Sequence, residues 1–314
     1  MNPPLNSQSS AVPESSINSK AIAPQVIPAS RSMYWSVRRE LWESRSIYIA
    51  PLAVAAVFLF GFLISTVHLP SKMRSALALE PSKQHELIQQ PYNFVALLIM
   101  GTTFIVALFY CLDALHGERR DRSILFWKSL PVSDATTVLS KASIPLVVLP
   151  LLTLAITVVA HCIMLLLSSV ALLGSGLRVA TLWNNLSLFQ MWVALLYHLV
   201  AIHALWYAPI FAWLLLVSAW ARRMAFLWAA LPLLAIGVLE KIAFNSSHLA
   251  ALLGNRLGGG AEGADFTPGS MAMDPLAHLN PGQFLISPGL WIGLIVAAAF
   301  LAGAIRLRRS QGPI

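Results

Sequence analysis

Long apolar stretches, interrupted by short polar segments, fill most of the chain from residue 47 to residue 305. A helix needs about 20 mostly apolar residues to cross the hydrocarbon core of a bilayer, whereas the apolar run of a buried core helix rarely exceeds about 14. The pattern therefore predicts six membrane-spanning helices. Their expected ranges are 47–67, 92–115, 142–173, 191–221, 224–239 and 290–305.

The third and fourth predicted spans are longer than a bilayer requires, at about 30 residues each. A helix of that length measures roughly 45 Å, against a hydrocarbon core of roughly 30 Å. Such helices must tilt, bend or extend into water. Pro145 and Pro150 in the third span and Pro209 in the fourth are the expected sites of bending, because proline removes a helical hydrogen bond.

The composition indicates that lipid is the solvent for most of the chain. Charged residues make up 11% and hydrophobic residues 57% of the 314 residues, and the mean hydropathy is +0.71. The apolar segments lack the alternation of a membrane β-barrel, and lipid cannot satisfy the open edges of a sheet. The fold class is therefore predicted to be an all-α membrane protein, with a six-helix domain over residues 47–309.

Lys and Arg residues are distributed unevenly between the two sides of the predicted bundle. Fifteen of the 21 lie before the first span, in the loops after the second and fourth spans, and after the sixth. Because basic residues accumulate in cytoplasmic loops, both the N- and C-termini are predicted to be cytoplasmic. The same bias accounts for the formal net charge of +8, so nucleic-acid binding is not needed to explain it.

The segment before the first span has a different character. Residues 1–30 are rich in Ser, Pro, Asn and Ala, which predicts a disordered cytoplasmic tail and no cleavable signal peptide. Residues 31–46 place Trp35 and Trp42 on one helical face and Glu40 on the opposite side. Aromatic and basic residues at the entrance to a span predict an interfacial helix; the alternative is a cytoplasmic extension of the first span.

The loop of residues 116–141, between the second and third predicted spans, is the most informative polar segment. It begins with a dense charge cluster in which Glu118 and Arg122, four positions apart, favour a short helix over residues 118–130. The loop closes with a Pro-Val-Ser-Asp turn, where Ser133 or Asp134 is expected to cap the third span.

Two aromatic residues follow the charge cluster of this loop. Because aromatic and Arg side chains dominate the anchors of protein interfaces, Phe126 and Trp127 are candidates for contact with another protein. The alternative is that both rings rest on lipid head groups. The residues expected at a partner contact are Glu118, Arg119, Arg120, Asp121, Arg122, Phe126, Trp127 and Lys128.

This loop resembles that of the membrane subunits of ABC-2 type ABC exporters. The run from Glu118 to Ser123, with Leu-Pro-Val-Ser-Asp at 130–134 and Ser-Lys at 140–141, is similar to the E-R…G/S…L-P-x-S…K stretch of that family. The resemblance covers residues 31–309. It implies a coupling helix that docks onto a separate ATPase subunit, a dimer with itself or a homologous permease, and a location in the bacterial inner membrane.

The commonest catalytic motifs do not occur in the sequence. There is no G-x-x-x-x-G-K-[ST] phosphate loop, so an ATPase would have to be a separate subunit, and neither H-E-x-x-H nor G-x-S-x-G is found. Cys111 and Cys162 fall within spans and predict no disulfide. With these motifs absent, the resemblance implies a permease that is not an enzyme and holds no cofactor. The apolar spans favour an amphiphilic cargo over a small ion.

Polar residues inside the spans are further candidates, because they are costly in lipid. An intramembrane enzyme or a haem- or metal-handling protein that uses His161, His198 and His203 is the alternative function. His198 and His203 do not share a helical face, so hydrogen bonding between helices is favoured over metal binding. With these two histidines, Glu240 and Lys241 are candidates for a transport path or gate, although an interfacial pair is the favoured interpretation of Glu240 and Lys241.

The long segment of residues 245–287 precedes the sixth predicted span and is expected on the outer side. Its glycines and prolines exclude one continuous helix. Helical spacing over residues 246–257 and over part of 273–285 predicts ordered ends, and the resemblance to ABC-2 type exporters implies that these ends cap the outer exit. The Gly-rich middle, residues 258–271, is predicted to be disordered.

Overall fold

The computed structural model describes residues 29–129, 132–176, 178–258 and 281–312, and every regular element in these ranges is a helix. Six helices in the described ranges are long and apolar enough to cross a membrane, which confirms the predicted fold class. They are Ser46–Leu77, Pro81–Arg120, Asp134–Gly174, Val179–Trp206, Ala225–Phe244 and Pro288–Ser310.

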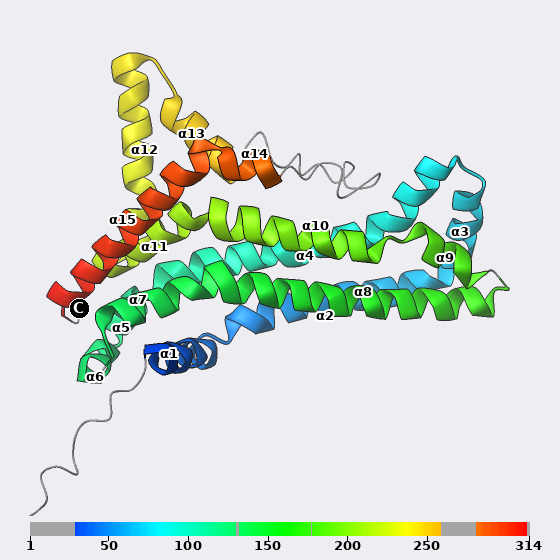
Figure 1. Cartoon of the computed structure of the whole chain (residues 1–314), viewed down its shortest axis with the longest axis horizontal. Helices are drawn as coiled ribbons and strands as arrows, with labels where there is room; N and C mark the ends of the chain where they lie inside the picture. The colour runs from blue at the N-terminus through cyan, green and yellow to red at the C-terminus, as the bar shows by residue number, and fades with distance from the viewer. Residues whose placement is uncertain (1–28, 130–131, 177, 259–280, 313–314) are drawn as a thin grey trace, which may run out of the picture.

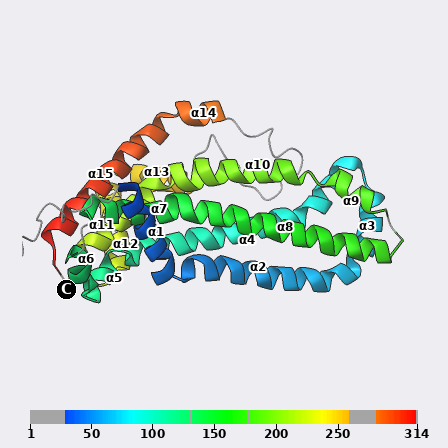
Figure 2. The ribbon, with the colours of Figure 1, turned by 60° about the horizontal axis from the view of Figure 1, so that its bottom comes forward.

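The body of the molecule is an elongated bundle of four helices (Figures 1 and 2). These are α2 (Ser46–Ser65), α4 (Pro81–Asp113), α8 (Leu149–Gly174) and α10 (Leu188–His198). Short helices α3 (Leu69–Leu77) and α9 (Val179–Asn185) lie at one end, which we call the α3 end.

Four other elements gather at the opposite end, which we call the α5 end (Figure 1). They are α1 (Ala29–Glu43), α5 (His116–Arg120), α6 (Ser123–Ser129) and α7 (Asp134–Ser143). The last turn of α15 (Pro288–Ser310) reaches the same end. The first described helix and the last one therefore lie at the same end of the bundle.

The predicted third and fourth spans, 142–173 and 191–221, are interrupted near their prolines, as the sequence predicts. Pro145 lies in a π-helical turn, η3 (Ile144–Val148), between α7 and α8, and Pro150 lies in the first turn of α8. A second π-helical segment, η4 (Leu199–Trp206), separates α10 from α11 (Ala208–Trp220), whose first turn contains Pro209. Proline has no backbone N–H, so one helical hydrogen bond is missing, and a wider helical turn accommodates this loss.

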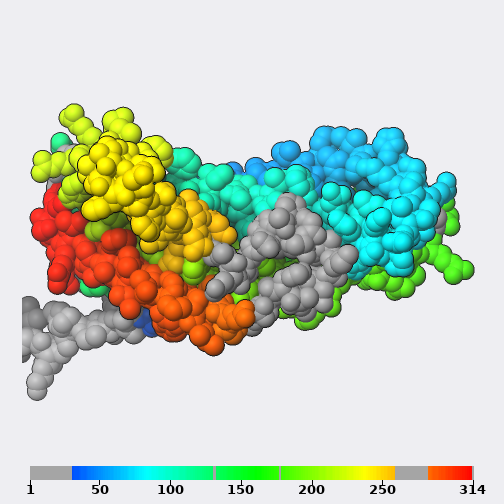
Figure 3. All heavy atoms as spheres, turned by 90° about the horizontal axis from the view of Figure 1, so that it is seen from above, coloured from blue at the N-terminus to red at the C-terminus, as the bar shows by residue number. Residues whose placement is uncertain are grey.

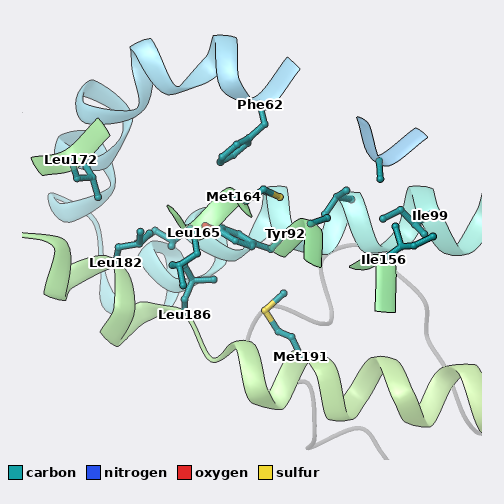
Figure 4. Packing of buried hydrophobic residues seen from close by; sticks show 14 of the residues in the cluster. Phe62, Tyr92, Ile99, Ile156, Met164, Leu165, Leu172, Leu182, Leu186 and Met191 are labelled. Atoms are coloured by element: carbon teal, nitrogen blue, oxygen red, sulfur yellow. The ribbon is translucent and has the colours of Figure 1, made fainter. Parts of the chain in front are cut away.

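Apolar side chains from several helices fill the α3 end (Figure 4). Phe62 of α2, Tyr92 of α4 and Met164 of α8 belong to this cluster and are buried. Leu182 of α9 closes it from the far end of the bundle. Methionine and aromatic rings fill irregular space between helices, so the four segments share one apolar interior.

The C-terminal third of the chain lies beside the bundle. Helix α12 (Ala225–Phe244) leans away from the long helices, α13 (His248–Leu257) turns back toward them, and α15 packs along α11 (Figures 1 and 3). The predicted helix over 246–257 is thus confirmed. Only Pro281–Ile286 (α14) is described of the second predicted helical end, and the predicted Gly-rich middle lies outside the described residues apart from Gly258.

Candidate functional site

Six charged side chains meet at the α5 end, and we call them the ion cluster: Arg39, Glu40, Glu118, Asp134, Lys141 and Arg308. Lys141 Nζ lies 2.9 Å from Glu40 Oε1 and 3.1 Å from Glu118 Oε1. Arg39 Nη2 donates to Glu118 Oε1 at 2.7 Å. The cluster contains three cations and three carboxylates, so its formal charges cancel.

Glu118 is the centre of the ion cluster. Arg308 Nη1 donates to Glu118 Oε2, and Arg308 Nε donates to Asp134 Oδ1 at 3.1 Å. Tyr110 on α4 adds a hydrogen bond from its hydroxyl to Glu40 Oε2 at 2.8 Å. The ion cluster therefore joins α1, α4, α5, α7 and α15, which are distant from one another in the sequence.

Most of the ion cluster is removed from solvent. The exposed fraction is 2% for Glu40 and Lys141, 7% for Glu118 and 5% for Arg308. Burying a charge is costly unless it is paired and hydrogen-bonded. Burial disfavours the Arg39 cation, but the carboxylates of Glu40, Glu118 and Glu43 more than offset this, so the pKa of Arg39 is raised from its ordinary value.

Local helix geometry places several members of the ion cluster. The Ser133 hydroxyl caps α7 by accepting from the Thr136 backbone N–H at 3.1 Å, which confirms the predicted cap. Asp134 and Lys141 are then seven residues apart on one face of the third span. Arg308 lies in the last turn of α15, where a cation is favoured by the helix dipole.

Helix α5 is also fixed to the end of α11. The Ser218 hydroxyl accepts from the backbone N–H groups of Leu115 and His116, at 3.0 and 2.8 Å. Arg119 donates from Nη1 to the Ala219 carbonyl at 2.6 Å, which satisfies a carbonyl in the last turn of α11. The start of α5 and the end of α11 thus satisfy each other's unpaired backbone groups.

Helix α6 forms the outer surface at this end. Ile124 is buried beneath it, whereas Phe126 is 60% and Leu125 59% exposed. Trp127 is partly covered, because the guanidinium carbon of Arg39 lies 3.6 Å from the centroid of its ring. The aromatic surface is therefore in direct contact with the ion cluster through Arg39.

The prediction of one continuous helix over 118–130 is wrong, because the structure has two separate helices, α5 and α6. Arg122 adopts a left-handed conformation, with φ of 58°, and separates α5 from α6. The predicted pair of Glu118 and Arg122 does not form, because Glu118 faces inward to Arg39, Lys141 and Arg308. Glu40 was expected on the polar side of its helix and is instead buried.

The eight residues expected at a partner contact divide into two groups. Glu118 and Arg119 are buried and bond within the chain, so they do not present a surface in this conformation. The six others lie at the surface, with Trp127 partly covered: Arg120, Asp121, Arg122, Phe126, Trp127 and Lys128. Arg120 pairs with Asp121, and Lys128 donates to the Gln311 carbonyl at 2.9 Å.

The histidines of the spans lie at separate places. His161 accepts a hydrogen bond from Trp192 Nε1 at 3.1 Å and, through its other ring nitrogen, contacts the Tyr92 carbonyl at 3.0 Å. These contacts join α8 to α10 and α4, in agreement with the prediction that the histidines form hydrogen bonds between helices. His203 packs against the rings of Phe104 and Phe211. Among the described residues, no group of three or more His, Cys, Asp and Glu side chains is placed to hold a metal ion.

Glu240 has a structural role at the end of α12. Its Oε1 accepts from the Ser246 hydroxyl at 2.8 Å, and its two oxygens accept from the backbone N–H groups of His248 and Leu249 at 2.6 and 2.9 Å. The carboxylate therefore satisfies the first N–H groups of α13. Lys241 lies beside it near the same helix end.

A scan against protein-family models, a search of curated proteins and a search of solved structures each found no match to this chain. The class of protein therefore follows from the fold: this is an all-α, multi-pass membrane protein. Its α5 end combines a buried, charge-balanced ion cluster with an exposed aromatic surface on α6.

Proposed function

We propose that this chain is the membrane-spanning permease subunit of an ATP-driven exporter of the ABC-2 type. In this proposal α5 and α6 contact a separate ATPase subunit on the cytoplasmic side of a bacterial inner membrane. One observation carries the proposal: the exposed ring of Phe126 lies on α6, which follows α5 after Arg122 and contacts Arg39 through Trp127, and Glu118 of α5 is joined by the ion cluster to α1, α7 and α15.

A partner that moves α6 would also move the spans. The ionic contacts around Glu118 are short and buried, so separating them would leave uncompensated charges at a cost of several kcal/mol. A displacement of α5 is therefore transmitted to α1, α7 and α15 rather than absorbed at the ion cluster. The partner must contact α6 differently in its ATP-bound and ATP-free states for this to drive a conformational change.

The π-helical segments offer places where the spans can bend during that change. η3 follows α7, which carries Lys141 and Asp134 of the ion cluster, and it packs against η4 of the fourth span. π-helical turns are frequent at functional sites and depart from regular hydrogen bonding. In this proposal α7 moves with α5, and α8 changes its angle at η3.

The proposal is tested by co-purification of the ATPase with Phe126→Ala. Truncating an aromatic interface anchor commonly costs at least about 2 kcal/mol, so the amount of bound ATPase should fall by more than about tenfold. Phe109→Ala is the matched control, because Phe109 is 65% exposed on α4, compared with 60% for Phe126 on α6. The ATPase is identified by mass spectrometry and by ATP hydrolysis.

Two results would contradict the proposal. Equal retention of the ATPase by both variants would favour the alternative that the α6 rings rest on lipid head groups. Failure of any phosphate-loop ATPase to co-purify with the wild-type chain from its native membrane would exclude the exporter assignment. Trp127→Ala is less suitable, because it also removes the intramolecular contact with Arg39.

Reporter fusions test the proposed orientation of the chain in the membrane. Fusions at Ser129 and Gln311 should report the cytoplasmic side, and a fusion at Gln84, near the α3 end, should report the outer side. We propose in addition that the permease pairs with a second copy or a homologous permease. An outer signal at Ser129 would place α6 out of reach of any cytoplasmic ATPase.

A further inference from the structure

A cavity of about 830 Å³ lies at the α3 end, between α2, α3 and α4. Its wall is mostly apolar, with Phe58, Phe62, Phe94 and Met73 among the lining side chains. Gly61 also lines it, and a Cβ atom built at Gly61 would meet no other atom within 4 Å. The volume is within the range of about 300–1,000 Å³ that is typical of small-molecule sites.

The depth of the cavity relative to a bilayer follows from α2. This helix has 20 residues from Ser46 to Ser65 and begins directly after the charged Arg45, so it is about as long as the hydrocarbon core is thick. Phe58 and Gly61 therefore lie inside the hydrocarbon layer. If α2 spans the layer, Ser65 falls at its edge, and we place Lys72 on α3 beyond it, at head-group level.

Polar groups are few in the wall, and they are concentrated toward that edge. Lys72 is the one charged side chain among the lining residues, and no described acidic residue lines the cavity with it. Ser71 and Ser75 lie beside it on α3. An exposed ammonium group above an apolar pocket is complementary to a molecule with a long apolar body and an acidic end.

Other lining residues also carry polar groups. Gln90, Tyr92 and Ser168 line the cavity, and the Tyr92 hydroxyl is buried beside Ser168. A wall that combines apolar side chains with groups able to form hydrogen bonds favours an amphiphile over a plain hydrocarbon.

We propose that this cavity binds an anionic amphiphile, with one alkyl chain beside Gly61 and the acidic head group at Lys72. This inference does not depend on an ATPase partner, because the binding site lies at the opposite end of the bundle from α6 (Figure 1). The occupant can be a lipid of the surrounding bilayer or a free amphiphile such as a fatty acid, since both present the same chemistry.

The test of the cavity is photolabelling of the purified full-length chain with a 16-carbon fatty acid that carries a diazirine. Gly61→Leu places a side chain in the empty space and, because leucine is a better helix former than glycine, should not harm folding. It should reduce saturable labelling of α2–α4 peptides by roughly tenfold. Gly101→Leu is the matched control: it is also a helical glycine with open space around it, but it lies outside the cavity.

The test of the head group compares the same fatty acid with the corresponding neutral fatty alcohol. Lys72→Gln should weaken binding of the acid by roughly tenfold and leave the alcohol nearly unchanged, because a charge-assisted hydrogen bond is lost. Arg74→Gln removes a neighbouring cation of α3 that does not line the cavity and should leave both probes unchanged.

The source of the occupant is distinguished by mass spectrometry of lipids that co-purify with the chain. An anionic phospholipid carried by the wild type and lost in Gly61→Leu would support the proposal with a bilayer lipid as occupant. Saturable labelling without such a lipid would support a free amphiphile. Equal labelling of the two glycine variants would overturn the proposal, and an equal effect of Lys72→Gln on acid and alcohol would overturn the anionic head group.

Discussion

Different interactions stabilise the two ends of the bundle. The α5 end contains six ionic side chains and a tyrosine hydroxyl that bond one another across five helices. The α3 end contains an apolar cluster and a cavity of about 830 Å³. The first arrangement has directional contacts that fix relative positions, whereas the second leaves room for a molecule to enter.

This difference has a physical basis in the membrane environment. Lipid tails are as apolar as leucine, so burial of apolar side chains between membrane helices brings little hydrophobic gain. A cavity at the α3 end therefore costs mainly lost packing contacts. Buried charges have no comparable alternative in lipid, so each member of the ion cluster depends strongly on its partners.

Removing the central lysine should have the largest effect. Lys141→Met takes one cation from between Glu40 and Glu118 and leaves a buried excess of negative charge. The expected loss of stability is about 3–5 kcal/mol, measured by thermal or SDS unfolding of the purified chain. Lys128→Met, on exposed α6, is the matched control and should change stability by less than about 0.5 kcal/mol. Similar small effects of both changes would mean that the ion cluster does not hold the α5 end.

Truncation in the apolar cluster should have a smaller effect. Met164 is fully buried on α8, and Met→Ala in a soluble core costs about 2–5 kcal/mol. Because the transfer of apolar groups from water is largely absent in lipid, Met164→Ala should cost only about 1–2 kcal/mol. The same unfolding assay measures this. A loss larger than that of Lys141→Met would reverse the comparison between the two ends.

The smallest effect is expected at the junction of α5 and α11. Ser218→Ala removes one hydroxyl that accepts from the backbone N–H groups of Leu115 and His116. Loss of a helix cap costs about 1 kcal/mol. Hydrogen exchange at the start of α5 should increase while that of the α3 end stays unchanged. Faster exchange throughout the bundle would indicate that this hydroxyl supports the whole fold rather than α5.

Hydropathy predicted the spans because membrane helices are defined by local composition. Each span is a continuous run whose solvent is lipid, and neither the length nor the charge of the run depends on distant residues. The interruptions at Pro145 and Pro209 were likewise predictable, because proline acts on its own helical turn. The N-cap at Ser133 belongs to the same kind of local signal.

The ion cluster was not predicted, because its contacts are distant in sequence. Glu118 meets Arg39 across 79 residues and Arg308 across 190, and Lys141 meets Glu40 across 101. A charge cluster beside a span is equally typical of a solvated loop, so the residues of 118–122 were read as surface. A signal was present in Lys141, a lysine adjoining a long apolar run, since such a residue needs a partner or water.

The cavity at the α3 end could not be predicted from the sequence either. Gly61 reads as an ordinary glycine of a membrane helix, and Lys72 as one basic residue of an outer loop. Their relation depends on how α3 packs against α4 and α8 at the end of the bundle, which no local pattern encodes. The cap that Glu240 provides for α13 likewise depends on how α13 turns back toward α12.

The central claim, that the ion cluster holds the α6 surface rigidly to the spans, is tested most directly by a distance measurement. Spin labels at Ser129→Cys on α6 and Ser46→Cys at the start of α2, with the exposed Cys162 replaced, report their separation by double electron–electron resonance. We expect one narrow distance distribution in the otherwise native chain and a broad one when Lys141→Met is added. A broad distribution in the native chain, or no change on adding Lys141→Met, would contradict the account.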